Sequence, residues 1–552
     1  MIATRGVLLT LFLVPIVLGA IRVLPVPVFT DEVIERDSTP ILFESIALSA
    51  LPMAFIAAVV GIIAVGSEYV DDVLSGSLAA VPRRAALILA KVVPAAALTF
   101  FVSVFGASAA AWIAFVTLDS RGYLAASLFE TAMLVASVAA GCALFAILGV
   151  AAAAVSRSTV MAVLIVLSLV FLVSRLVLVI AGEAGLQLVE WLPSSALQAM
   201  TTHGPAEAIV TDMAPASSLS PSQGSIALLV FALGALGLSI VTFSRRRVHR
   251  VIGVRRAPQF FPLERRMRAL PLRSTFAGVI RSEALKARSA PSVRWLLLLS
   301  LLANVLLAVQ WAGLTTPEQQ QPDPVRAWDL EYLTFDQSNR AIIAGIALTH
   351  LLIAGVGAII ATSDFATGAI RPALAAVPNR ARLVLAKVFV AAAATFIVSA
   401  ASLITAAPLV VVVLQHQGYN ASLTDPVIGL SILRGSLVLV LTAAIGSGLG
   451  FIVRSASGTL LTLAATFIVF PYVLSWLQEP TRRTPFVWFA NISQLFPDPI
   501  EAAGLHHPST SYQILDTENR LHFGSELDLP VLLVWATATV LIGWLGLRRR
   551  GV

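Results

Sequence analysis

Long apolar runs recur along the whole chain, and they limit its fold more than any other feature. A helix needs about 20 mostly apolar residues to cross the ~30 Å hydrocarbon core of a bilayer. Twelve runs meet this need, at residues 7–24, 45–66, 87–118, 127–153, 160–181, 225–243, 295–314, 342–362, 383–414, 427–453, 459–477 and 530–547. We therefore predict an all-α polytopic membrane protein with about twelve transmembrane helices.

The scarcity of charge excludes whole classes of protein. Only 12% of the 552 residues are charged, against about 25% in soluble chains, so a water-soluble enzyme of this length is excluded. None of the three lysines, Lys91, Lys286 and Lys387, follows a glycine. This excludes a P-loop, which needs Gly-Lys-Ser/Thr at the start of a helix. The single cysteine, Cys142, excludes a disulfide within the chain.

A segment near residue 80 recurs almost unchanged near residue 376. The sequence Leu78-Ala-Ala-Val-Pro-Arg-Arg84 matches Leu374-Ala-Ala-Val-Pro-Asn-Arg380, and Lys91 and Lys387 keep the same offset of 296 residues. Self-similarity at a fixed offset indicates a structural repeat. We interpret the chain as a tandem duplication of a six-span unit.

The number of spans and the distribution of charge predict the topology. Six is an even number, so the two copies are parallel repeats with a pseudo-symmetric interface between them. Most Lys and Arg residues lie at the termini and in the loops after even-numbered runs, and cytoplasmic loops are enriched in these residues. Both termini are therefore predicted to be cytoplasmic. The predicted units are a first six-span half at 1–243, a basic cytoplasmic linker with a connecting helix at 244–293, and a second six-span half at 294–552.

The two longest outer loops follow the fifth run of each half, at about residues 182–224 and 478–529. Both begin near aromatic and proline residues, including Trp191 and Trp488. Because Trp favours the level of the lipid headgroups, short re-entrant or interfacial helices are one interpretation of these loops. The alternative is that they are lids over the outer end of the bundle.

The central linker is strongly basic, with fourteen Lys and Arg residues between Arg245 and Arg294. Such a segment attracts anionic lipid headgroups. Its last part, residues 276–288, predicts an interfacial helix that leads into the seventh run. The apolar face expected for this helix comprises Phe276, Val279, Ile280 and Leu285.

Two cytoplasmic loops, at residues 67–86 and 363–382, have the same design. Each combines an acidic-aromatic pair, a short amphipathic turn, a proline, basic residues and then a lysine in the next run. This pattern predicts a compact helix-turn-helix on the inner membrane face, presented to a cytoplasmic partner.

The repeated Leu-Ala-Ala-Val-Pro segments, with the acidic residue before them and Ala-Lys after them, resemble the cytoplasmic signature of ABC-transporter permeases of the type-2 exporter class. The run Arg281-Ser-Glu-x-x-Lys286 resembles the lead-in helix of that family. Trp191-Leu-Pro193 and the Arg-Arg-Arg stretch before residue 551 fit as well. The resemblance covers both halves, but the first half lacks the lead-in sequence before its first run.

The resemblance implies that residues 67–86 and 363–382 are coupling helices that dock on a separate ATP-binding subunit, present in two copies. Residues 276–290 would be the connecting helix that touches the same subunit. ATP and Mg²⁺ would bind in that partner, and this chain would carry no cofactor, metal or catalytic residue. The implied ATPase-coupling residues are Glu68, Asp71, Asp72, Pro82, Arg83, Arg84, Asp364, Arg371, Pro378, Arg380, Glu283 and Lys286.

The function expected from these features is ATP-driven export across the cell membrane, and the membrane expected is the inner membrane of a bacterium. Few charges lie within the runs, which favours a hydrophobic or amphiphilic cargo such as a drug, antibiotic, lipid or peptide. The alternative is a secondary transporter of the major-facilitator type, which shares twelve spans in two parallel halves. Such carriers place ionisable residues inside the bundle, and those available form no evident carboxylate relay: Glu130, Arg175, His350 and Arg434. A membrane enzyme is a third alternative, but His506 and His507 lack further metal ligands nearby.

Overall fold

The structure is a computed structural model of the chain. It describes residues 2–23, 39–70, 84–120, 127–174, 187–201, 219–245, 275–313, 330–464, 466–467, 499–505 and 528–549, together with the single residues 123, 177 and 185. Within these ranges the regular structure is entirely helical.

The helices fall into two groups along the chain. The first group is α1 (Ile2–Val23), α2 (Thr39–Val70), α4 (Arg84–Asp119), α5 (Leu128–Ser156), α6 (Thr159–Leu167), the π-helical turn η1 (Ser168–Leu172), α8 (Pro193–Thr201) and α9 (Pro221–Arg245). The second group is α10 (Phe276–Ser289), α11 (Pro291–Ala312), α12 (Leu330–Ile343), α13 (Ile346–Ala366), α14 (Ile370–Ala376), α15 (Arg380–His416), α16 (Pro426–Val453), α17 (Ala456–Ala464), α20 (Pro499–Ala503) and α21 (Asp528–Arg549).

Nine segments of the described chain are helical, long and apolar enough to span a membrane. They correspond to α2, α4, α5, α9, α11, α12 with α13, α15, α16 and α21. The chain is therefore a helical membrane protein, as the apolar runs predict. The other three predicted runs, at 7–24, 160–181 and 459–477, overlap α1, α6 and α17 but extend onto residues outside the described ranges. The count of twelve and the cytoplasmic termini stay predictions.

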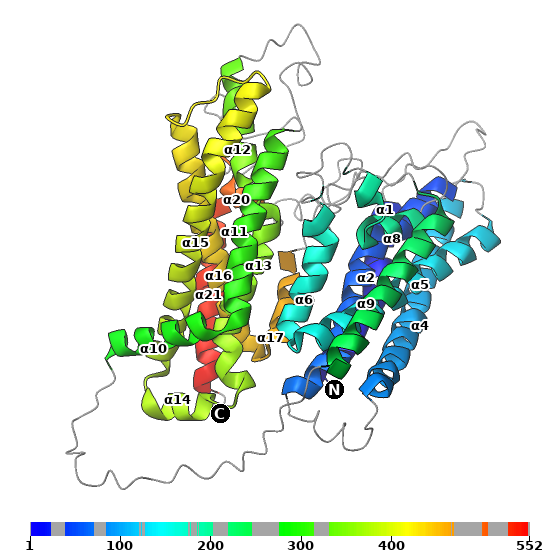
Figure 1. Cartoon of the computed structure of the whole chain (residues 1–552), viewed down its shortest axis with the longest axis horizontal. Helices are drawn as coiled ribbons and strands as arrows, with labels where there is room; N and C mark the ends of the chain where they lie inside the picture. The colour runs from blue at the N-terminus through cyan, green and yellow to red at the C-terminus, as the bar shows by residue number, and fades with distance from the viewer. Residues whose placement is uncertain are drawn as a thin grey trace.

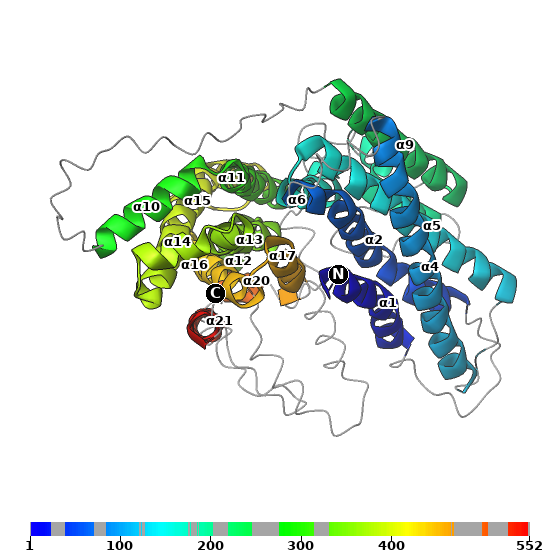
Figure 2. The same ribbon diagram turned by 90° about the horizontal axis from the view of Figure 1, so that it is seen from below.

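The long helices stand side by side in two bundles, α1 to α9 and α11 to α21, while α10 and α14 lie across one end of the second bundle (Figure 1). Corresponding helix pairs pack in both bundles: α2 on α5 and α13 on α16, α4 on α5 and α15 on α16, α9 on α5 and α21 on α16. The bundles meet through α6, which contacts α11 and α17 (Figures 1 and 2).

Glycines allow the central helix pair of each bundle to approach until backbone touches backbone. A Cβ added at Gly61 in α2 would collide with the carbonyl of Ala146 in α5, and one at Gly149 would collide with the carbonyl of Ala58. Small residues at such contacts let membrane helices pack closely. The second bundle repeats both contacts, from Gly357 to the carbonyl of Ala443 and from Gly446 to the carbonyl of Ala354.

Short helices occur in both of the long outer loops. Helix α8 packs against α2, α5 and α9 and is buried along nearly its whole length. Helix α20 packs against α13, α16 and α21. It is held by polar contacts, because Arg434 Nε donates to the Ala502 carbonyl at 2.7 Å and Asn339 Nδ2 donates to the Leu505 carbonyl at 3.1 Å. Short helices therefore occur in both loops, and their re-entrant, interfacial or lid role stays a prediction.

The glycine contacts generate a prediction about stability. Gly446→Ala should destabilise the protein by about 1–3 kcal/mol, because the new methyl group overpacks the contact between α16 and α13. Gly429 lies on the same helix with open space around its Cβ position, so Gly429→Ala should be neutral or gain up to about 1 kcal/mol of helix propensity. Thermal unfolding in detergent measures both. Equal melting temperatures for the two variants would contradict the close packing.

Candidate functional site

Helix α10 lies across the end of the second bundle and buries one narrow stripe. Its N-cap is Thr275, whose hydroxyl accepts from the backbone N–H of Gly278. The buried residues are Val279, Glu283 and Ala287, four residues apart, which places them on one side of the helix. The stripe therefore brings a carboxylate into the protein along with two apolar side chains.

The apolar face predicted for this helix is wrong in two respects. Val279 is buried and Ile280 is partly buried, as predicted, but Phe276 is 41% exposed and Leu285 is 61% exposed. The packed face follows Glu283, and a position two residues after Glu283 falls on the opposite side of an α-helix. The pairing of Glu283 inside the protein outweighs the burial of Leu285.

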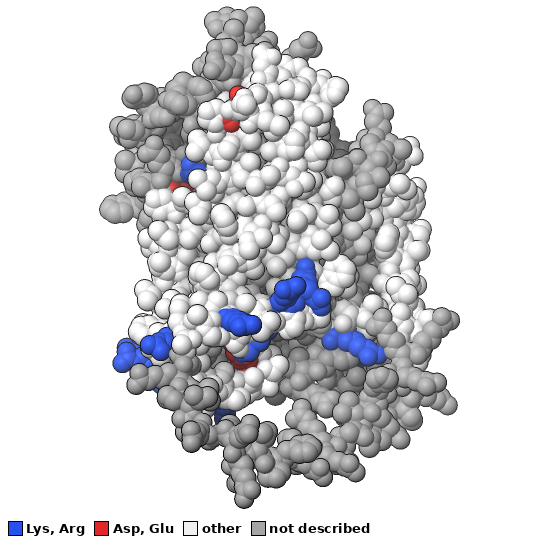
Figure 3. Space-filling model, turned by 60° about the vertical axis from the view of Figure 1, so that its left-hand side comes forward, with Lys and Arg blue, Asp and Glu red and all other residues white. Residues whose placement is uncertain are grey.

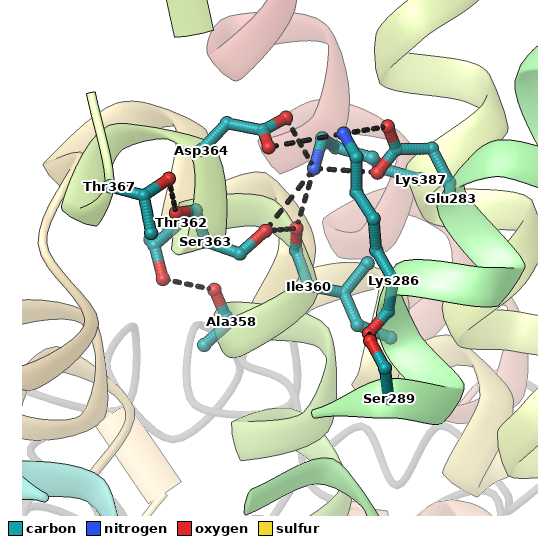
Figure 4. A network of polar contacts seen from close by, with 10 residues as sticks. All are labelled: Glu283, Lys286, Ser289, Ala358, Ile360, Thr362, Ser363, Asp364, Thr367 and Lys387. Carbon is teal, nitrogen blue, oxygen red and sulfur yellow. Dashed lines mark hydrogen bonds and ion pairs between the residues drawn. The ribbon is translucent and has the colours of Figure 1, made fainter. Parts of the chain in front are cut away.

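Four charged residues meet where α10, α13 and α15 come together, and we call Glu283, Lys286, Asp364 and Lys387 the charge ring (Figure 4). Lys387 Nζ lies 2.8 Å from Glu283 Oε2 and 2.9 Å from Asp364 Oδ2. Lys286 Nζ lies 2.7 Å from Glu283 Oε1 and 3.2 Å from Asp364 Oδ1. Each carboxylate thus bridges both lysines, and the four formal charges sum to zero.

Burial makes this arrangement important for the local structure. Lys387 is completely buried, and Glu283 and Asp364 are each only 3% exposed. Lys387 Nζ also donates to the carbonyl of Ile360 at 2.9 Å and to Ser363 Oγ at 3.4 Å. Buried charges are tolerated when they are paired and hydrogen-bonded, whereas removing one partner leaves an uncompensated charge. The ring therefore ties α10 to the end of α13 and to α15.

Lys286 closes the ring on its more exposed side. Burial lowers the pKa of its ammonium, but the hydrogen bond and charge of Glu283 and the charge of Asp364 outweigh burial, so its pKa is raised. Because its pKa is raised, Lys286 stabilises the folded state at pH values below the ordinary lysine pKa of about 10.4. This stabilisation is lost only as the pH rises through the raised pKa. Lys286 therefore stays charged at neutral pH. Its side chain is 42% exposed, so solvent screens its contribution.

The first bundle repeats one contact of this site. Lys91 Nζ donates to the carbonyl of Ala64 at 3.0 Å, just as Lys387 donates to Ile360, and each carbonyl lies 27 residues before its lysine. Glu68 in α2 stands at the position that corresponds to Asp364. Its side chain lies outside the described part of the structure.

Helix α14 lies across the end of the second bundle, directly after α13 (Figure 1). The turn from α13 passes through Gly368, whose φ of 69° suits glycine. A small apolar core anchors the helix to its neighbours: Val279 and Ile280 of α10, Ile370, Ala373 and Leu374 of α14, Val377 after it, and Leu383 and Ala386 of α15. The opposite side is exposed and includes Arg371, Pro372, Ala375 and Pro378.

Two arginines bind the end of α21 to the same region. Arg380 Nη1 donates to the carbonyl of Leu547 at 2.6 Å and to that of Arg548 at 3.0 Å. Arg454 Nη2 donates to the carbonyl of Gly546 at 3.1 Å, and its guanidinium lies over the ring of Phe365 in α13. Unsatisfied carbonyls at a helix C-terminus carry partial negative charge, so these cations cap α21.

The conformation of Arg454 is itself unusual. Arg157 and Arg454 are the residues other than glycine with positive φ in the described chain, at 55° and 59°. They end α5 and α16 at corresponding places, and the next residues, Ser158 and Ser455, accept hydrogen bonds from the N–H groups of Met161 and Gly458. Glycine would adopt this backbone more readily, which indicates that the side chain of Arg454 matters.

The predicted coupling residues thus have different surroundings. Glu283, Lys286 and Asp364 join the charge ring, and Arg380 caps α21, whereas Arg371 is exposed on α14 and Pro378 is exposed just after it. Asp71, Asp72, Pro82 and Arg83 lie outside the described residues, as do the side chains of Glu68 and Arg84 in α2 and α4.

Lys387 is the residue that sequence reasoning missed. The repeat marked its position but gave it no role. A signal was available, because a lysine within an apolar run is costly unless it has a partner, and Glu283 and Asp364 were the nearby acids on the same predicted membrane face.

Other candidates form no comparable cluster. His350 Nδ1 lies 2.7 Å from the Ile346 carbonyl, and its ring meets that of Phe467 edge-on. Glu130 is in the first turn of α5. Within the described ranges no group of three or more His, Cys, Asp or Glu residues could hold a metal ion. Four residues from the alternative readings lie outside those ranges: Arg175, His203, His506 and His507.

Basic side chains gather at the end of the molecule where α10 and α14 lie, whereas acidic side chains are seen mainly toward the other end (Figure 3). We call this group of basic side chains the basic belt, and its described residues include Arg281, Arg288, Arg371, Arg382 and Arg548.

Comparisons of the chain with protein-family models, with curated proteins and with solved structures find no match.

The charge ring generates the second prediction. Lys387→Met should destabilise the protein by about 3–5 kcal/mol, because two buried carboxylates would then share one lysine. Adding Glu283→Gln restores a net charge of zero and should recover part of the loss. Thermal unfolding in detergent measures both variants. Arg382→Gln removes an exposed positive charge from the same helix and serves as the control. A Lys387→Met variant as stable as this control would contradict a structural role for the ring.

The two left-handed arginines generate the third prediction. Glycine at either position relieves about 1 kcal/mol of backbone strain, so Arg157→Gly should be neutral or stabilising. Arg454→Gly gains the same relief but loses the cap on α21 and should be the less stable of the two. Comparing the free energies of unfolding isolates the side-chain contribution. Equal shifts in both variants would show that the guanidinium of Arg454 adds nothing.

Proposed function

We propose that this chain is the permease subunit of an ATP-driven ABC exporter, powered by a separate cytoplasmic ATPase that is present in two copies. The observation that carries the proposal is the corner built by α10 and α14. The short exposed helix α14 packs on a small apolar core, beside three longer helices that a buried charge ring ties together. Such an element suits docking to a partner that delivers a mechanical load.

The placement of the basic belt supports the orientation in this proposal. Lys and Arg mark the cytoplasmic side of membrane proteins, and they gather where α10 and α14 lie (Figure 3). The ATPase would therefore bind α14 on the cytoplasmic side of the plasma membrane, for example the inner membrane of a bacterium. ATP and Mg²⁺ would be bound by that subunit.

The repeated packing supports a pseudo-dimeric permease. The same helix pairs and the same glycine contacts occur in both bundles, and the equivalent helices α6 and α17 contact each other between them. In the proposed mechanism, ATP closes the ATPase dimer and moves α14. Helix α14 passes this motion to α13 and α15, which the charge ring holds together, so that the second bundle rocks against the first as a rigid body. The substrate path would open between the two six-span halves.

The proposed cargo is hydrophobic or amphiphilic. The spanning helices carry few charged side chains, which suits a drug, antibiotic, lipid or hydrophobic peptide as the cargo. Purification of the tagged full chain from its native membrane should yield a complex that hydrolyses ATP, and amphiphilic compounds should stimulate this hydrolysis. Transport by the chain alone in a pH gradient would overturn the proposal and favour a secondary transporter.

The fourth prediction tests the docking surface. Arg371 is exposed on α14 and lies outside the charge ring, so Arg371→Glu should leave the melting temperature unchanged. If an acidic surface of the ATPase faces it, a like-charge contact costs several kcal/mol, and recovery of ATP-hydrolysing complex should fall by roughly tenfold or more.

The control for this test is Arg340→Glu on α12. Arg340 pairs with Asp336 at the other end of the bundle, and both side chains are partly exposed, so the change should affect neither stability nor ATP hydrolysis much (Figure 1). Full ATP hydrolysis by the Arg371→Glu complex would remove α14 from the docking surface.

A further inference from the structure

The outward face of α10 combines arginine and exposed leucine. Arg281, Leu285 and Arg288 lie on the side opposite the buried stripe, and all three are exposed. The charge of Lys286 is already used in the ring, but neither arginine takes part in it. This face therefore presents two guanidinium groups on either side of an apolar side chain.

The position of α10 directly before a spanning helix determines the depth of this face in the membrane. Helix α10 ends at Ser289, and the spanning helix α11 begins at Pro291, so α10 lies where α11 enters the bilayer. Trp295, in the second turn of α11, is 55% exposed, and tryptophan favours the level of the lipid headgroups. Seen from below, α10 runs along the outer edge of the second bundle (Figure 2).

An interfacial environment suits this combination of side chains well. Leu285 would be unfavourable in water, and two arginines would be costly in hydrocarbon. An amphipathic helix at the headgroup level satisfies both, because its cations meet phosphates while its apolar side chains enter the acyl boundary. Guanidinium groups bind phosphate oxygens in a bidentate manner.

We propose that the Arg281–Leu285–Arg288 face of α10 is a binding site for anionic phospholipid headgroups. The two arginines hold the phosphate-bearing headgroup, and Leu285 contacts the upper part of the acyl chains. This site is independent of the proposed function, because it depends on α10 and the membrane and not on an ATPase. It also brings the charge ring close to the lipid surface, since Glu283 and Arg281 lie on opposite sides of the same helix.

The test is lipid binding to the purified full chain in detergent, measured by native mass spectrometry with phosphatidylglycerol or phosphatidylcholine. Wild-type protein should retain phosphatidylglycerol in preference to phosphatidylcholine, and inorganic phosphate should compete poorly. A basic residue near an anionic surface is worth roughly fivefold in affinity, so Arg281→Gln/Arg288→Gln should lower phosphatidylglycerol binding by an order of magnitude or more. Leu285→Ser should weaken the retention of both lipids.

Matched variants decide the interpretation. Arg157→Gln removes an exposed arginine from the first bundle and should bind phosphatidylglycerol as the wild type does. Equal retention of the two lipids by the wild type, or wild-type binding by the double arginine variant, would overturn the proposal. A double variant that keeps its lipids but loses its ATP-hydrolysing partner would also overturn it, and would assign this face to protein docking.

Discussion

The buried ammonium of Lys387 is the interaction on which the architecture of the α10–α14 corner depends. A lysine with no exposed surface must find compensation inside the protein. It finds one carboxylate on α10, a second at the end of α13 and a carbonyl one turn earlier in α13. These groups fix the position of a helix that would otherwise be held only by a thin apolar contact. Helix α14 inherits its position from them, because it follows α13 after a single turn.

The helical scaffold can be predicted from the sequence because its contacts depend on short sequence patterns, and these patterns occur in both halves of the chain. Apolar runs of the right length give the helices, and the repeat gives their correspondence. Gly61 and Gly357 stand at the same offset as the lysines of the repeat, and each removes a Cβ where two helices touch. A glycine within an apolar run is thus a signal of close packing that needs no knowledge of distant residues.

The site is harder to predict from the sequence because the residues that interact in it lie far apart in the chain. Glu283, Lys286 and Asp364 could be selected from sequence as one functional group, and the structure brings them together. The direction of their side chains could not be predicted, since it depends on which face of α10 packs against α14 and α15. Val279, Glu283 and Ala287 follow one another at a spacing of four residues. This spacing predicts a packed stripe only if a charged residue is allowed inside it. Arg380 is similar, because its partners lie 167 and 168 residues away at the end of α21.

The rigidity of the α10–α14 corner limits where the protein can deform. Charges held in a low-dielectric site resist separation, so α10, α13, α14 and α15 move together when any one of them is displaced. The caps from Arg380 and Arg454 add the end of α21 to the same unit. Rearrangement is therefore easier where the bundles meet, through α6 and its contacts with α11 and α17. There α6 continues directly into the π-helical turn η1, and π-helical turns are rare and occur frequently at functional sites. Rigidity at the α10–α14 corner, together with a contact between the bundles through α6, favours rocking of one bundle against the other over bending within a bundle, as the proposed mechanism requires.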